Sequence, residues 1–195
     1  MSNDAVTMAQ LGDVAEARPG YPFRGAIKSV PGGELAVVQI KNADPEQGVD
    51  WGALVSTTPA GRKSPDWLRS GDVLFIARGN RNVAVHLDQV PARAVCAPQF
   101  YLLRVRGDLV LPAYLAWYLN EGPAQRYFEQ SAEGSVVTSI RRQILEALPL
   151  PIPDLQRQQL IVNLVDTARR EKQLTEQLIR NREQQLTLVA RGLIQ

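Results

Sequence analysis

The feature that most constrains how this chain can fold is its carboxyl-terminal stretch, in which nothing from Leu155 to Arg191 breaks a helix. One continuous helix there would contain about 37 residues and extend for roughly 55 Å at the usual rise per residue. Asp154 is placed to cap its first turn, because an aspartate oxygen accepts a hydrogen bond from a free amide group. A domain of ordinary size cannot cover that length. We therefore expect one domain over residues 1–153 and a separate long helix over residues 154–195.

The expected helix is preceded by a segment with alternating prolines, Leu148-Pro149-Leu150-Pro151-Ile152-Pro153. Proline has no backbone amide hydrogen, and it disfavours a helical conformation in the residue before it. The segment is therefore predicted to be a stiff, non-helical boundary.

Apolar residues on the expected helix recur mostly at spacings of three, four and seven, which makes one of its faces apolar. Read as heptads, the best apolar seam also places polar residues at core positions, namely Thr167, Glu171, Asn181 and Gln185. Polar core positions weaken a parallel leucine zipper, so antiparallel pairing or docking on other helices fits the pattern better. The candidate residues for dimerisation and partner docking are Leu160, Leu164, Leu174, Leu178, Leu186 and Leu188.

The preceding residues alternate between strand-like and turn-like sequence. Apolar runs bounded by turn residues predict strands at residues 34–41, 72–77, 83–87 and 100–105, and the last three are expected to form a sheet. Two short helices are expected, one from Pro112 and one over residues 123–131, each with a proline in its first turn. The polar stretch 42–70 is predicted to be a long loop, and such a loop is usually functional. The fold class is therefore α+β, a mixed β-sheet domain with short helices followed by one long helix.

The composition is that of a soluble globular protein, with 45% hydrophobic and 22% charged residues. Cys96 is the only cysteine, which excludes an intramolecular disulfide and a cysteine-based metal site and points to a reducing compartment. No apolar run approaches the roughly 18 residues that a membrane helix needs, and residues 1–10 lack the pattern of a signal peptide. We expect a cytoplasmic protein that does not contact a membrane.

Side chains suited to catalysis are few and isolated. His86, the only histidine, falls within a strand pattern, and Cys96 is more typical of a small buried hydrophobe than of a nucleophile. The sequence has neither a glycine-rich phosphate loop nor the aromatic tetrapeptide with which an adenine methyltransferase holds a flipped base. We therefore expect a protein that is not an enzyme and that uses no cofactor and no metal.

One enzymatic alternative is a metal-dependent nuclease, because Gln39-Ile40-Lys41 is a glutamine variant of the acidic residue and lysine that end a strand in such enzymes. Magnesium requires carboxylate oxygens, and Glu34 lies several residues upstream of this pair. The sequence therefore disfavours a nuclease.

Basic residues give the stronger functional signal. The net charge is only +2, but of the 22 Lys and Arg residues only four are lysines, which leaves 18 arginines. Arginine and lysine neutralise phosphates, and arginine, asparagine and glutamine also read base edges with paired hydrogen bonds. Three clusters are candidate DNA contacts: Lys41, Asn42, Arg62 and Lys63; Arg78, Asn80 and Arg81; and Ser135, Thr138, Arg141 and Arg142.

These clusters also have interpretations without DNA. A GC-rich genome raises the arginine content by itself, and arginines in solvated turns form surface ion pairs. Trp51 and Trp67 flank the long loop, where they would either stack on bases or, as we favour, anchor the loop.

Several short motifs occur in a defined order along nearly the whole chain. They are Leu11-Gly-Asp-Val with Gly20-Tyr-Pro-Phe23, Val38-Gln-Ile-Lys41, Gly71-Asp-Val-Leu-Phe-Ile-Ala-Arg-Gly79 with Asn82-Val-Ala84, Phe100-Tyr-Leu-Leu-Arg-Val105, Pro112-Ala-Tyr-Leu-Ala-Trp-Tyr-Leu119, Gly134-Ser135 with Ile140, the proline-rich segment, and Gln158-Gln159-Leu160-Ile161. In this order and spacing, the chain resembles the DNA specificity subunit of type I restriction-modification systems. The resemblance implies a target-recognition domain that reads one half of a split DNA site, and a long helix that acts as a spacer and docks methyltransferase subunits.

The sequence departs from that family in one respect. A standard specificity subunit has two recognition domains and two helices, and no second copy of the motifs appears here. Two copies of the chain, paired antiparallel through the long helix, would restore the arrangement and predict a palindromic split site. The expected partners are double-stranded DNA, a second copy of the chain and an adenine methyltransferase, with restriction subunits as further candidates. The alternative is a decoy or regulatory interaction module that keeps the fold without reading DNA.

Overall fold

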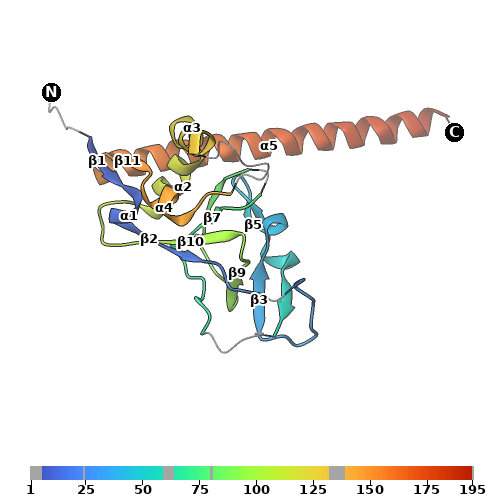
Figure 1. The fold of residues 1–195 in the computed structure, drawn as a ribbon. Helices are drawn as coiled ribbons and strands as arrows, with labels where there is room; N and C mark the ends of the chain where they lie inside the picture. The colour runs from blue at the N-terminus through green and yellow to red at the C-terminus, as the bar shows by residue number, and fades with distance from the viewer. Residues whose placement is uncertain (1–5, 24, 59–63, 80, 132–138, 195) are drawn as a thin grey trace, which may run out of the picture. The chain divides into compact units, whose positions relative to one another are not determined.

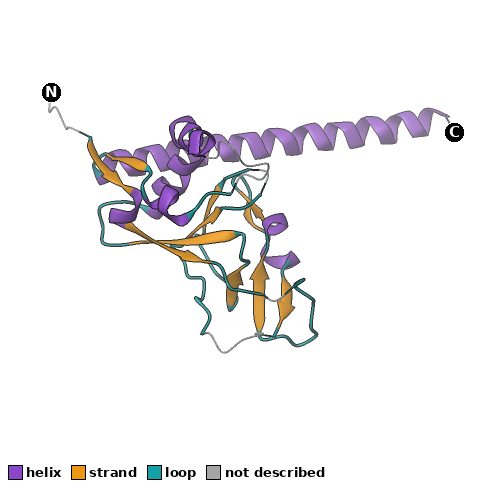
Figure 2. Cartoon of the chain, in the orientation of Figure 1, coloured by secondary structure: helices purple, strands orange, loops and turns teal. Residues whose placement is uncertain are grey.

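The computed structural model describes residues 6–23, 25–58, 64–79, 81–131 and 139–194 (Figure 1). The chain divides into two compact units, residues 1–159 and residues 160–195. Strands and short helices make up most of the described part of the first unit, and the described part of the second unit is helical (Figure 2). The predicted α+β class with a long carboxyl-terminal helix is thereby confirmed.

The first unit contains a four-stranded sheet with the order β2-β10-β7-β8, in which every neighbouring pair is antiparallel (Figure 1). Its strands are β2 (Ala15–Pro19), β10 (Phe100–Val105), β7 (Val73–Ile76) and β8 (Ala84–His86). The last three confirm the strands predicted at residues 72–77, 83–87 and 100–105. β2 was not predicted, because its sequence contains no β-branched or aromatic residue.

A second sheet has the order β6-β3-β9 and consists of β6 (Val55–Thr57), β3 (Leu35–Val38) and β9 (Ala94–Cys96). β3 runs parallel to β9 and antiparallel to β6. β3 confirms the strand predicted at residues 34–41, and it lies in a different sheet from the three strands that were predicted together. Parallel pairing joins strands that are far apart in the sequence, so local patterns do not reveal it.

One hydrophobic core is shared by the two sheets. It contains Leu35 of β3, Leu74 of β7 and Leu102 of β10, together with Cys96 of β9. Burial raises the pKa of the Cys96 thiol to about 12, so the thiol stays protonated near neutral pH. The interpretation of Cys96 as a small buried hydrophobe is confirmed.

Residues 42–58 contain regular structure, so the prediction of one long loop over residues 42–70 is wrong in this part. A small hairpin of β4 (Ala43–Asp44) and β5 (Gly48–Val49) is followed by the short 3-10 helix η2 (Trp51–Ala53) and then by β6. Elements of two or three residues carry too little periodicity to be recognised from the sequence.

The two tryptophans of the stretch 42–70 pack against the core, which confirms the anchoring interpretation. Trp51 and Trp67 are both partly buried there. The guanidinium carbon of Arg93 lies 4.2 Å from the centre of the Trp67 ring, a cation–π contact.

The proline-rich segment is confirmed as non-helical and forms a strand, β11 (Pro149–Ile152), paired antiparallel with β1 (Thr7–Gln10). Because prolines occupy alternate positions, the intervening residues keep their amide hydrogens on one edge of the strand. On the other edge, the carbonyl groups of Pro149 and Pro151 accept hydrogen bonds from the hydroxyls of Tyr118 (3.1 Å) and Tyr114 (2.8 Å). One edge of β11 therefore pairs with β1, and the other edge is bonded to the two tyrosines.

The short helices of the first unit are α1 (Leu11–Val14), α2 (Pro112–Asn120), α3 (Gly122–Ser131) and α4 (Arg142–Glu146). Of these, α2 and α3 confirm the helices predicted from residue 112 and over residues 123–131. Helix α2 supplies both tyrosines that bind the proline-rich strand.

The long helix α5 (Leu155–Ile194) begins where the sequence predicts, because Asp154 Oδ1 accepts the backbone N–H of Arg157 at 2.8 Å. Gln158 in its first turn is fully buried. Its Oε1 accepts the N–H of Leu111 (2.8 Å), and its Nε2 donates to the carbonyls of Leu109 (2.9 Å) and Pro153 (2.7 Å). The start of the helix is thereby fixed to the first unit. Within the described residues, none of the helices combines the length and apolar character needed to cross a membrane.

Candidate nucleic-acid interface

Three strand ends meet at a β-turn formed by residues 97–100. The turn is closed by the N–H of Phe100, which donates to the carbonyl of Ala97 at 3.1 Å. The N–H of Ala97 donates to Val38 at the end of β3 (2.9 Å), and the carbonyl of Gln99 accepts the N–H groups of Ala77 (2.8 Å) and Arg78 (3.2 Å) after β7. Because β9 runs directly into this turn, the ends of β3, β7 and β9 are tied together.

The segment before α4 is bonded to residues 77 and 78, which follow β7 and contact the 97–100 turn. Arg78 forms an isolated antiparallel bridge with Ser139, and the N–H of Ile140 donates to the carbonyl of Ala77 at 2.9 Å. Ile140 is buried, and Arg141 follows it as the residue that precedes α4. Two of the predicted clusters, around Arg78 and around Arg141, are therefore brought together although they are distant in the sequence.

The start of the remaining predicted cluster is adjacent as well. Lys41 belongs to the 3-10 helix η1 (Ile40–Asn42) that follows β3. A side-chain carbon built at Gly79 would lie 3.6 Å from Ile40 Cδ1 and 3.2 Å from Ile76 Cγ2, so Gly79 packs close to both isoleucines. The turn after β7 thus lies beside η1.

Arg81 lies in the hairpin between β7 and β8, whose closure depends on a buried asparagine. Asn82 is 8% exposed, and its Nδ2 donates to the carbonyl of Ile76 at 2.9 Å. The carbonyl of Asn82 in turn accepts a hydrogen bond from Gln125 Nε2 at 2.8 Å. The base of the hairpin is therefore held in place, while Arg81 itself is exposed.

The cations of this region differ in whether their charge is neutralised. Lys41, Arg78, Arg81 and Arg141 are exposed, and no acidic side chain in the described ranges forms an ion pair with any of them. Arg142, in contrast, forms an exposed ion pair with Glu146, with Nε and Oε1 2.7 Å apart. The first four charges remain available for an external anion, and we call these four residues the basic cluster.

Five further residues of the predicted interface, Arg62, Lys63, Asn80, Ser135 and Thr138, lie outside the described residues.

Asn42 was predicted to contact DNA, but the structure places it in the interior, where its side chain is only part of the local scaffold. It is 4% exposed; its Oδ1 accepts the N–H of Gln39 (3.1 Å) and its Nδ2 donates to the carbonyl of Ala53 (3.2 Å). Both functions of the amide are already used. We therefore leave Asn42 out of the interface that we propose below.

We expect Asn42→Ala to lower the free energy of unfolding by about 1 to 3 kcal/mol, because two backbone groups lose their partner in a buried place. Urea unfolding of the two proteins measures this difference. DNA affinity, measured well below the unfolding transition, is expected to stay within about twofold of the original, since no phosphate contact is removed. Unchanged stability with a large loss of affinity would instead return Asn42 to the interface.

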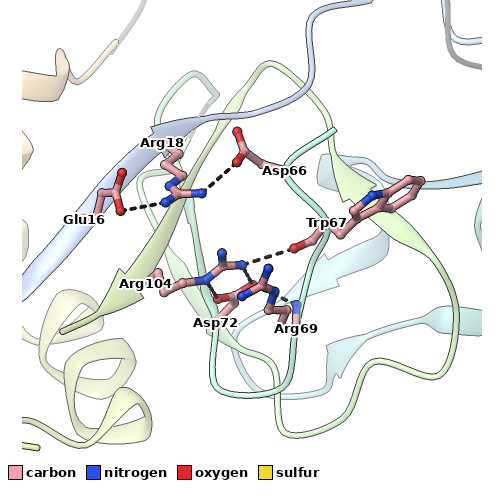
Figure 3. A network of polar contacts seen from close by, with 7 residues as sticks. All are labelled: Glu16, Arg18, Asp66, Trp67, Arg69, Asp72 and Arg104. Carbon is pink, nitrogen blue, oxygen red and sulfur yellow. Dashed lines mark hydrogen bonds and ion pairs between the residues drawn. The ribbon is translucent and has the colours of Figure 1, made fainter. Parts of the chain in front are cut away.

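A network of charged residues holds the chain that enters β7 (Figure 3). Asp72 is 2% exposed, and its carboxylate accepts hydrogen bonds from Arg104 Nε and Nη2, both at 2.8 Å, and from the N–H of Arg69 at 2.8 Å. Arg104 Nη2 also donates to the carbonyl of Trp67 at 3.1 Å. The hydrogen bond to Asp72 raises the pKa of the Arg104 guanidinium.

The same network continues on β2. Arg18 donates to Glu16 and to Asp66, each at 2.8 Å. The hydrogen bond from Arg18 lowers the pKa of Glu16, and the bonds to Glu16 and Asp66 raise that of Arg18 (Figure 3). These arginines are thus occupied within the fold, unlike those of the basic cluster.

The described residues offer no evident catalytic centre. His86 lies in β8, as predicted, with its Nδ1 2.9 Å from Asp88 Oδ1. Among the described residues, no group of three or more His, Cys, Asp and Glu side chains is placed to hold a metal ion. Glu34 precedes the start of β3 and Lys41 follows its end, so the strand separates the two groups that a nuclease would have to combine.

The fold and the basic cluster together define a class of protein: an α+β unit with two larger sheets, exposed cations without an acidic partner among the described residues where strand ends meet, and a long helix that follows. A scan against protein-family models and a search of curated proteins found no match. Solved structures, however, do match.

The similar structures are chains of type I restriction-modification systems. One belongs to a structure that describes complex assembly and conformational transition of the type I R-M system, with a TM-score of 0.66 and 19% identity over 97% of this chain and 44% of that chain. The HsdS subunit from Thermoanaerobacter tengcongensis matches with a TM-score of 0.62 and 19% identity over 88% of this chain and 39% of its own. The S subunit from M. genitalium matches with 0.60 and 15% identity over 94% and 44%.

This chain therefore has the fold of the HsdS subunits of type I restriction-modification systems. It spans less than half the length of the structures that it matches.

Proposed function

We propose that this chain binds double-stranded DNA sequence-specifically, as the specificity component of a type I restriction-modification system or a related phage-defence system. The observation that carries the proposal is the basic cluster: exposed cations with no acidic partner among the described residues, in a chain with the HsdS fold. In this role the first unit reads one half of a split site. The protein itself is not an enzyme, and partner subunits supply the chemistry.

Electrostatics supports a polyanion as the ligand of the basic cluster. Its members come from three segments, the helix η1, the β7–β8 hairpin and the residue before α4, which the 97–100 turn and the bridge at Ser139 hold together. Phosphate contacts from such cations release condensed counterions and position a protein on the duplex, while base edges supply the sequence preference. A fixed backbone below exposed cations suits the task of positioning the duplex through its phosphates.

The second unit supports pairing with another copy of the chain. Six predicted pairing residues of α5 are all largely exposed: Leu160 58%, Leu164 62%, Leu174 59%, Leu178 69%, Leu186 62% and Leu188 67%. Burying each leucine would contribute about 1.5 to 3 kcal/mol, so a surface with this many exposed leucines favours a protein partner. The polar residues Thr167, Glu171, Asn181 and Gln185 in the seam favour an antiparallel arrangement.

Two antiparallel copies would place two recognition units in one assembly. A two-fold axis makes the two half-sites equivalent, so the recognised sequence would be a palindrome with a central gap. On this proposal the paired helices also form the surface that docks an adenine methyltransferase and restriction subunits. The likeness to a chain of an assembled type I system supports that extension.

The test of the function is selection of bound duplexes from a random library by the purified chain. We expect enrichment of a split palindrome, and an affinity that falls steeply with salt. No enrichment at moderate salt would overturn DNA reading in favour of a decoy or regulatory module. Magnesium-dependent cutting of DNA by the chain alone would contradict a role without catalysis.

A variant arm of the same experiment tests the pairing. Leu174→Glu with Leu178→Glu places charges in the proposed seam, and we expect light scattering to show a monomer whose selected sequence is a single half-site. Thr187→Glu with Ala190→Glu, about half a helical turn away from the seam, adds the same charge and is expected to leave the dimer intact. Equal behaviour of the two variants would rule out pairing through this face.

A further inference from the structure

The turn at residues 97–100 carries a polar residue outside the predicted clusters. Gln99 occupies the third position of this turn, after Pro98, whose fixed φ suits the second position. Ala97 and Phe100, on either side, are buried, whereas Gln99 is exposed. The turn therefore presents one amide side chain to the outside of a buried junction.

The backbone below Gln99 is tied to other segments on several sides. Its carbonyl accepts the N–H groups of Ala77 and Arg78 at 2.8 and 3.2 Å. Immediately before the turn, the carbonyl of Cys96 accepts the N–H of Tyr21 at 2.8 Å. Because this backbone is already fixed, only the side-chain torsions of Gln99 have to be ordered when its amide binds a ligand.

The side chain of Gln99 itself is not used by the fold. Within the described ranges, it makes no hydrogen bond. Two other glutamines show the contrast: Gln125 Nε2 donates to the carbonyls of Asn82 and Leu119, and both ends of the Gln158 amide are bonded internally. Those amides hold the structure together, and that of Gln99 is available to a ligand.

The surroundings of Gln99 are cationic. Arg78 is bonded to it through the backbone, and the bridge between Arg78 and Ser139 brings the segment with Arg141 to the same place. A duplex held by these cations through its phosphates would lie over the turn. An amide at that position can pair with adenine, because its oxygen accepts from N6–H and its nitrogen donates to N7 in the major groove.

We propose that Gln99 is a specificity-determining residue that reads an adenine in the major groove of the recognised duplex. This inference rests on the proposed function, since it assigns one base contact within the same interface. It adds a residue that lies in none of the three clusters and gives it a different task from theirs. The arginines position the DNA, and the amide selects a base.

The experiment repeats the duplex selection with Gln99→Ala, Gln99→Glu and the matched control Gln89→Ala. The side chain of Gln89 is also exposed and makes no hydrogen bond within the described residues. Gln89 follows β8, however, and so lies at the end of the β7–β8 pair that is opposite to Ala77 and the 97–100 turn. We expect Gln99→Ala to lose the preference for adenine at one position of each half-site, roughly 5- to 150-fold in discrimination, with the other positions and the salt dependence unchanged. Gln99→Glu is expected to shift that position towards cytosine, whose N4 donates to a carboxylate.

The outcomes separate the inference from the function. If the original chain selects a sequence and Gln99→Ala selects the same one, the inference is overturned and the proposed function stands. If Gln89→Ala changes the sequence in the same way as Gln99→Ala, the inference is likewise overturned. If the original chain enriches no sequence, the proposed function falls and the inference falls with it. Thermal unfolding of all variants checks that the exposed substitutions leave the fold intact.

Discussion

Replacing Arg78, Arg81 and Arg141 together by alanine is expected to lower the affinity for any duplex by roughly 100-fold per protomer near physiological salt, which corresponds to three lost phosphate contacts. The slope of log affinity against log salt should become shallower by about 2.7, because each contact releases close to one counterion. Fluorescence anisotropy titrations of one labelled duplex at several salt concentrations measure both quantities. The effect should be similar for specific and non-specific duplexes, since phosphates carry no sequence information.

The control is a variant with the same change in charge elsewhere, Lys28→Ala with Arg69→Ala and Arg106→Ala. All three residues are exposed. Arg69 precedes β7 and Arg106 follows β10, so both lie at the strand ends remote from the 97–100 turn. Lys28 is two residues before Val30, whose N–H donates to the carbonyl of Ser56 in β6. We expect this variant to bind within a few-fold of the original. If both triple variants lose affinity equally, net charge and not the basic cluster governs binding.

Asp72→Ala is expected to cost about 3 kcal/mol of the free energy of unfolding. The substitution removes a buried carboxylate that accepts two hydrogen bonds from Arg104 and one from the N–H of Arg69. It leaves the Arg104 guanidinium, 22% exposed, without its ionic partner (Figure 3). A charge deprived of its partner in a mostly buried place is costly, because neither water nor protein compensates it fully. Urea unfolding followed by circular dichroism measures the loss.

Two comparisons give that prediction its controls. Glu146→Ala breaks the exposed pair with Arg142 and should cost no more than about 0.5 kcal/mol. The double variant Asp72→Leu with Arg104→Met removes both charges, and we expect it to be more stable than Asp72→Ala, because no buried charge is left alone. A loss below about 1 kcal/mol for Asp72→Ala would show that solvent replaces the carboxylate at Arg104.

The two networks of arginines explain how one chain can be both stable and receptive to an anion. Arg18 forms ion pairs with Glu16 and Asp66, and Arg104 forms one with Asp72, so the charge of both arginines is neutralised within the fold. Arg78 and Arg141 have no acidic partner among the described residues; the N–H of Arg78 is bonded to the 97–100 turn, and Arg141 follows Ile140, whose N–H is bonded to Ala77. The arginine count in the sequence does not distinguish these two groups. Only the pairing of each side chain does.

For the fold, the sequence was sufficient wherever the determining interactions are local. The helix from Leu155 begins at Asp154 because an aspartate caps the amide groups that follow it, and β10 coincides with the predicted run at residues 100–105. The alternating prolines excluded a helix at residues 148–153 for the same local reason. The sequence did not reveal that this segment is a strand, because its partner β1 lies at the other end of the first unit's sequence.

For the candidate interface, the sequence by itself determined the residue types and their proximity to strand ends, and tertiary structure decided which of them act together. Residue type and the position after a strand made Asn42 a candidate, but it is buried and two internal hydrogen bonds occupy its amide. Gln99 was passed over because its only local signal is the preceding Pro98, which predicts a turn and not its surroundings. The physical reason is range: capping, proline stereochemistry and periodicity act within a few residues, whereas the parallel pairing of β3 with β9 and the bridge from Arg78 to Ser139 join distant segments.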